Sequence, residues 1–177
     1  MTSVDEYQAA LWAFSLDRYT RPGVSDRCLT LQDSLGADVN VLLLCLWRGQ
    51  HGADIPETVL QDCLQGNAGA WHRDVVQPIR SARRAMKGRT SAGDSRGVET
   101  CRDQLKRIEI ECERLEQQML VAALAATDEF AVSAGHSKKS CVEKAIANVT
   151  RYLRLITAVP SPDFDDQVKG LVVACID

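Results

Sequence analysis

An apolar stripe of helical period in the third quarter of the chain constrains the fold most strongly. Apolar residues recur there at alternating steps of three and four, between charged residues: Val98, Cys101, Leu105, Ile108, Cys112, Leu115, Met119 and Ala122. This repeat predicts one long amphipathic helix, which we expect to continue to about Phe130. Because an apolar helix face needs a partner, we expect the stripe to pack against other helices of the same chain. A coiled-coil partner or a second copy is the alternative.

The rest of the sequence also has helical patterns, and no alternating strand pattern of any length is found. A capping box at Ser3–Glu6 predicts the first helix start, and a second box at Ser140–Glu143 predicts another near the C-terminal end. Pro78 is expected to kink the helix that contains it. The remaining predicted helices follow turn signals and span about 24–35, 39–48, 56–65, 70–87 and 164 onward. We predict an all-α fold, a bundle of seven or eight helices with one long amphipathic helix and no sheet.

Length and composition favour one domain over residues 1–177, since a single core typically serves about 100–200 residues. Hydrophobic content of 45% and charged content of 25% are typical of globular proteins. The longest apolar run, residues 41–47, is far shorter than the roughly 20 residues of a membrane-spanning helix. The acidic start, with Asp5 and Glu6, is unlike a signal peptide. We therefore expect a cytoplasmic protein without a membrane segment.

Charge is distributed unevenly along the chain. Residues 67–107 carry a net charge of +6, whereas the segments before and after them carry −5 and −4. The basic segment can neutralise the acidic ends within the fold, or it can form a face for an acidic partner or a nucleic acid. A nucleic-acid-associated regulator acting through residues 73–107 is therefore one possible function, although the acidic ends argue against unspecific affinity.

No motif in the sequence predicts catalysis, a metal or a cofactor. The seven cysteines form no Cys-x-x-Cys pair and fit reduced, mostly buried thiols. His51, His72 and His136 lie outside the His-Glu-x-x-His and Glu-x-x-His patterns, so a metal site would require long-range contacts. Phosphate-binding loops and nucleophile elbows are absent from the sequence as well. We name no catalytic residue, metal ligand or cofactor, and enzyme activity is the less favoured class.

Polar residues cluster at the corner between the second and third predicted helices. Gly36 suits a helix C-cap, and Asp38 is better explained as an N-cap than as a catalytic acid. Asn40 begins an otherwise apolar helix, so we expect its amide to bond a neighbouring helix. With charged residues of two later helices, these groups are predicted to form a buried polar network or a ligand cleft: Gln32, Asp33, Asp38, Asn40, Arg80, Arg83, Arg84, Glu109 and Glu113.

One ion pair within this set is predicted specifically. We expect Arg83 or Arg84 to pair with Asp33, Glu109 or Glu113. Arg84→Ala would then cost several kcal/mol if its pair is buried.

The tryptophans Trp12, Trp47 and Trp71 all lie in the N-terminal half, and their rings would meet in the core if their helices pack together. Alternatively, two of them could line a groove beside the basic face and form a binding site. The residues proposed to bind a partner or ligand are Arg80, Arg83, Arg84, Lys87, Trp47 and Trp71.

Short motifs recur between residues 10 and 120 in a specific combination: Trp12, Tyr19, Pro22-Gly23-Val24, Cys28-Leu29-Thr30-Leu31-Gln32-Asp33, Gly36-Ala37-Asp38-Val39-Asn40, Trp47, Trp71, Pro78-Ile79-Arg80, Arg83-Arg84 and the 106–114 stretch. This combination resembles a family of small, uncharacterised proteobacterial proteins. The resemblance implies a soluble helical domain and no particular activity. We expect residues 1–130 to form the family-like core and the helices of residues 140–177 to pack on it.

These observations favour a non-enzymatic protein-interaction or adaptor domain with a protein partner. The alternative is a helical protein that binds a small molecule in a cleft lined by arginine and tryptophan. An exposed apolar patch on the long helix would favour a protein partner or a homo-oligomer, whereas a lined pocket would favour the ligand.

Overall fold

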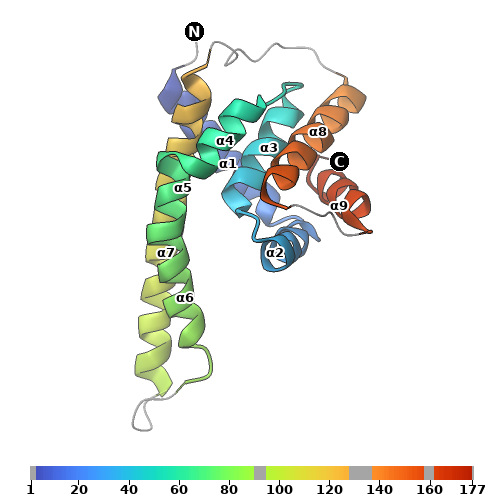
Figure 1. Ribbon diagram of the computed structural model, residues 1–177. Helices are drawn as coiled ribbons and strands as arrows, with labels where there is room; N and C mark the ends of the chain where they lie inside the picture. Colours follow the sequence, from blue (N-terminus) through green and yellow to red (C-terminus); the bar gives the residue numbers. More distant parts are fainter. Residues whose placement is uncertain (1–2, 90–94, 128–136, 158–161, 177) are drawn as a thin grey trace.

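A computed structural model of the chain describes residues 3–89, 95–127, 137–157 and 162–176, most of which are helical and none of which form a strand (Figure 1). The elements are α1 (Val4–Tyr19), α2 (Val24–Leu35), α3 (Val39–Gln50), α4 (Glu57–Gln65), α5 (Asn67–Trp71), the π-helical turn η1 (His72–Val76), α6 (Gln77–Ala85), α7 (Ser95–Ala125), α8 (Lys138–Ile156) and α9 (Phe164–Ile176). Because α5, η1 and α6 are continuous, the described residues form eight helical segments. The predicted all-α class with one long helix is confirmed.

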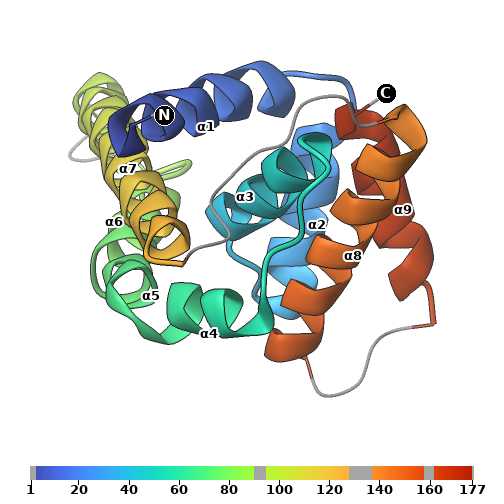
Figure 2. The ribbon, with the colours of Figure 1, turned by 90° about the horizontal axis from the view of Figure 1, so that it is seen from above.

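Helix α3 is the centre of the core, and Figure 2 shows the other helices arranged around it. Every residue from Asn40 to Gly49 is buried. Helices α3 and α8 pack closely, since a Cβ added to Gly49 would lie 2.3 Å from the Cα of Ala145. None of the described helices is long and apolar enough to cross a membrane.

Helices α6 and α7 form a hairpin that extends away from the helices around α3 (Figure 1). The C-terminal part of α7 belongs to the core, where Leu120, Val121 and Leu124 are fully buried. Its N-terminal part runs beside α6 instead. No residue of α6 is fully buried, and Arg80 and Arg83 of this helix hydrogen-bond to Glu109 and Glu113 of α7.

The apolar stripe of α7 is buried only in part: Met119 packs against the core, but the expected packing of the stripe against the bundle is wrong for Cys101, Ile108 and Leu115. Ile108 is 50% exposed, Leu115 is 37% exposed, and Cys101 is also exposed. The face turned inward instead carries Glu109 and Glu116, because polar and charged groups of the facing helices hydrogen-bond to these carboxylates. Further expected stripe residues are half-buried or exposed: Leu105, Cys112, Met119 and Ala122.

Two of the four predicted helix starts at Ser3, Asp38, Pro56 and Ser140 are confirmed. The capping box of Ser3 and Glu6 is confirmed, and the Asp38 side chain caps α3 by accepting a hydrogen bond from the backbone N–H of Asn40 at 2.8 Å. Helix α8, however, begins at Lys138 with Ser137 as its cap, so the predicted box at residues 140–143 is wrong. Pro56 precedes α4 instead of beginning it.

The structure accommodates Pro78 by a π-helical turn ahead of it. The Gln77 amide donates to the His72 carbonyl five residues earlier, and Pro78 lies in the first turn of α6. The extra residue of this turn rotates the inward face, so that Val76 is buried and Val75 only half-buried. Helix α7 runs from Ser95 to Ala125 and so stops earlier than the expected end at about Phe130; residues 128–130 and His136 lie outside the described residues.

Candidate functional site

A cleft of about 600 Å³ lies between α1, α2 and α3 on one side and α6 and α7 on the other. The first side is mainly apolar and is formed by Trp12, Leu16, Tyr19, Leu29, Val39 and Leu43. The opposite side carries six basic residues and two acidic ones: Arg80, Arg83, Arg84, Lys87, Arg102, Lys106, Glu109 and Glu113. An apolar wall therefore faces a predominantly cationic wall.

Arg80 of α6 organises the polar part of the cleft by hydrogen-bonding to two other helices, α7 and α2. Its Nε donates to Glu109 Oε1 at 2.9 Å, its Nη2 donates to Glu113 Oε1 at 2.5 Å, and its Nη1 donates to Gln32 Oε1 at 2.5 Å. Only 13% of the Arg80 side chain is exposed. The guanidinium thus links α6 to both α7 and α2 in a largely buried network.

The two neighbouring arginines differ in their surroundings. Arg83 pairs with Glu109 through both Nε and Nη2, the second contact being 3.1 Å. Arg84 lies 3.7 Å from Asp33, but these side chains are 52% and 65% exposed. The expected pairing of an arginine with one of the named acids is present twice, and the buried pair is that of Arg83.

Arg80 and Arg83 act differently on the two carboxylates of α7. Burial by itself would raise the pKa of Glu109, but hydrogen bonds from Arg83 and Arg80 outweigh burial and lower this pKa. Burial dominates at Glu113 and raises its pKa, although Arg80 opposes this shift. Glu109 is therefore held as a carboxylate, whereas protonation of Glu113 is easier than usual.

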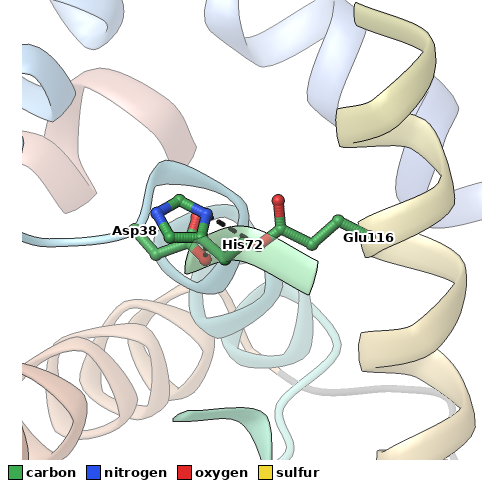
Figure 3. Close-up of side chains that lie close together, drawn as sticks. All are labelled: Asp38, His72 and Glu116. Carbon is green, nitrogen blue, oxygen red and sulfur yellow. Dashed lines mark hydrogen bonds and ion pairs between the residues drawn. The ribbon is translucent and has the colours of Figure 1, made fainter. Parts of the chain in front are cut away.

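A second polar cluster lies deeper in the protein, where Asp38, His72 and Glu116 converge from α3, η1 and α7 (Figure 3). His72 Nδ1 lies 3.0 Å from Asp38 Oδ2 and 3.0 Å from Glu116 Oε1. All three residues are buried, and Glu116 is completely so. One atom from each side chain lies within 4.8 Å of the others, an arrangement that can hold a metal ion.

Asn40 connects the deep cluster to the cleft, whose lining includes this residue. Its Nδ2 donates to Glu116 Oε2 at 2.8 Å, while its Oδ1 accepts from Gln117 Nε2 at 2.9 Å. Gln117 also bonds Ser15 of α1. The expectation that Asn40 bonds a neighbouring helix is confirmed, and that helix is α7.

Burial raises the pKa of both carboxyl groups in the deep cluster. At Asp38, burial is reinforced by the neighbouring Glu116, and the pKa rises well above its ordinary value. The pKa of Glu116 is also raised by burial, despite the hydrogen bonds that it receives. Two carboxyl groups so close together in the interior favour a shared proton or a cation between them.

Trp47 and Trp71, which were proposed to line the binding cleft, lie outside it. Trp47 is buried in the core, where its ring meets Tyr7 edge to face at 6.0 Å between centroids. Trp71 is half-buried, and its Nε1 donates to the Cys112 carbonyl at 3.0 Å. Neither lines the cleft, whose aromatic residues are Trp12 and Tyr19. The arginines Arg80, Arg83 and Arg84 and the lysine Lys87 do line it, as expected of a binding site.

Sequence reasoning missed His72, Glu116, Gln117 and Ser15 as members of the polar site. A signal for Glu116 was present, because Glu109, Glu113 and Glu116 recur at steps of four and three and so share one face of α7. For His72 the sequence offered no such signal, since its partners come from distant segments.

Fold and site together define an all-helical domain with a buried polar network beneath a cleft. Residues 10–120 match the family described as "Protein of unknown function (DUF2390)". The chain belongs to this family, and the resemblance noted in its sequence is confirmed. No curated protein and no solved structure shows significant similarity to the chain.

Proposed function

We propose that this protein is a non-enzymatic, cytoplasmic interaction domain whose cleft binds an acidic, amphipathic segment of a partner protein. The proposal rests on the contrast between the two walls of the cleft. An amphipathic helix laid into a groove uses its apolar face for affinity, and charges on its edges set its orientation. The apolar wall of α1–α3 fits the apolar face of such a segment, and the cationic wall of α6 and α7 fits its acidic edge.

Exposed apolar residues at the cleft strengthen this proposal. Leu16 is 53% exposed, and Leu29 and Ile110 are also exposed, although all three line the same cleft. Large apolar side chains grouped beside charged ones are a common sign of an interaction site. Arg84 and Lys87 lie on the opposite wall, where the weak pair of Arg84 with Asp33 leaves it accessible to an acidic group.

An anionic, partly apolar small molecule is the second candidate for this cleft. A volume of about 600 Å³ lies within the range of about 300–1,000 Å³ that is common for small-molecule sites. Nucleic acid fits less well, because Arg80 and Arg83 are already paired with carboxylates and are less available to phosphates. Ile108 and Leu115 on the outer face of α7 form a separate surface at which a second copy of the chain could pair.

Site-specific photo-crosslinking in the native cells tests the proposal. A photoreactive residue replaces Leu29 in the cleft or, as a control, Val173, which is 48% exposed on α9 and does not line the cleft. We expect one protein to be cross-linked at position 29 alone, through an acidic, amphipathic segment. A synthetic peptide of that segment should bind the purified protein, more weakly at high salt.

Charge-reversal variants then identify the surface. Arg84→Glu combined with Lys87→Glu should weaken binding of that peptide at least tenfold, whereas Lys169→Glu on α9 should leave it unchanged. Equal cross-linking at both positions would contradict the proposal. A small molecule retained by the native protein in mass spectrometry, with no cross-linked protein, would favour the second candidate.

A further inference from the structure

We propose that Asp38, His72 and Glu116 form a binding site for a divalent first-row transition metal ion. Each residue comes from a different part of the fold: Asp38 is the N-cap of α3, His72 begins η1, and Glu116 lies on the buried face of α7 (Figure 3). The site is separate from the cleft residues that would contact a partner, and it does not depend on the proposed interaction function.

The spacing of the three groups fits coordination. Histidine nitrogen and carboxylate oxygen bind such metals at about 2.0–2.2 Å, so neighbouring ligands of an octahedral ion lie about 3.0 Å apart. His72 Nδ1 lies 3.0 Å from one oxygen of Asp38 and 3.0 Å from one oxygen of Glu116. A single ring nitrogen carries at most one proton, so it cannot donate a full hydrogen bond to each of two carboxylates. One metal ion can bind all three groups at the same time.

Neighbouring groups orient the carboxylates for this task. The second oxygen of Asp38, Oδ1, accepts a hydrogen bond from the backbone N–H of Asn40 at 2.8 Å. The second oxygen of Glu116, Oε2, accepts one from the side-chain Nδ2 of Asn40, also at 2.8 Å. The remaining oxygen of each carboxylate therefore faces His72. Hydrogen bonds to the outer oxygens of ligands are the usual way in which proteins fix metal-binding carboxylates. Asn40 supplies both of these bonds, and Gln117 holds Asn40 in turn.

The ligand chemistry indicates the class of metal. Imidazole favours zinc, iron, nickel and copper, whereas carboxylates suit manganese and magnesium; a mixed set of one imidazole and two carboxylates therefore favours Mn²⁺, Fe²⁺ or Zn²⁺ over Mg²⁺. A divalent ion would also compensate two carboxylate charges in a buried site. Three protein ligands leave further coordination positions for water or another small ligand.

Metal titration of the purified, chelator-treated full chain tests this site. We expect one Mn²⁺ ion to bind per chain, as measured by electron paramagnetic resonance of free Mn²⁺, with Zn²⁺ competing and Mg²⁺ competing at least tenfold more weakly. Glu116→Gln and His72→Asn should each weaken Mn²⁺ binding at least tenfold while retaining the helical circular dichroism of the native protein. His51→Asn is the matched control and should leave binding unchanged, because the His51 ring contacts the Trp47 carbonyl and ring at the end of α3 and is not one of the three proposed ligands.

Nuclear magnetic resonance of the unaltered protein locates the bound metal without any variant, so the test does not depend on whether the variants fold. Bound Mn²⁺ should broaden the imidazole resonances of His72 at substoichiometric metal, before those of His51. Stoichiometric binding that survives Glu116→Gln and His72→Asn would overturn the proposal. So would the absence of Mn²⁺ and Zn²⁺ binding by the folded chain at neutral pH, which would leave the three groups as a proton-sharing structural cluster.

Discussion

Replacing Arg80 by methionine should test whether the network under the cleft stabilises the fold. Methionine keeps most of the aliphatic volume, so the change removes mainly the three donated hydrogen bonds. Glu109 retains Arg83, but Glu113 and Gln32 lose their contacts with the guanidinium. Removing one partner of a buried ion pair typically costs about 3–5 kcal/mol. Because Glu113 is partly exposed and can take up a proton, we expect the lower end of this range, about 3 kcal/mol.

Urea unfolding followed by tryptophan fluorescence measures this cost, with the slope m expected to stay constant. For a chain of this size, about 3 kcal/mol corresponds to a fall in Tm of roughly 6–12 °C. Arg84→Met is the control, since its exposed pair with Asp33 should contribute less than about 1 kcal/mol. Adding Glu113→Gln to Arg80→Met should recover part of the loss, because the unpaired carboxylate is then gone. Equal, small costs for Arg80→Met and Arg84→Met would refute the assignment of Arg80 as the buried centre of the network.

Three further predictions concern pH and packing. Glu109 has a lowered pKa in the folded state, so its stabilisation is present above the unfolded value of about 4.3 and is lost as pH falls through the folded value. The difference in unfolding free energy between the native protein and Glu109→Gln should therefore shrink in urea titrations below about pH 4.3. Ile108→Gln should change the free energy of unfolding by less than about 0.5 kcal/mol, because this side chain is half exposed. Leu120→Ala, in the buried part of α7, should cost about 2–5 kcal/mol in the same assay. Similar costs for the two variants would mean that the apolar stripe is buried at Ile108. Gly49→Ala should cost about 1–3 kcal/mol and lower the Tm in calorimetry, since its Cβ would overlap Ala145 and force α3 and α8 apart; an unchanged Tm would contradict the close packing.

Local sequence signals were enough to predict the helical class and several helix ends, because these depend on contacts between residues close together in the chain. The capping box of Ser3 and Glu6 closes within one turn, and the cap formed by Asp38 needs only the amide of Asn40. Gly36 ends α2 with a left-handed φ of 71°, which glycine adopts without a Cβ clash. Polar candidates such as Arg80 and Glu109 were also identifiable, since they follow helical spacing on charged faces.

Contacts between segments far apart in the chain determine which face of α7 is buried. The apolar stripe through Ile108 has the periodicity of a core face, but periodicity does not reveal what the neighbouring helices present. Where a neighbour supplies Arg80, burial of Glu109 becomes possible, because hydrogen bonds and opposite charge offset its desolvation. The same reason explains the deep cluster: His72 and Glu116 are 44 residues apart, and their contact exists only because the fold brings η1 and α7 together.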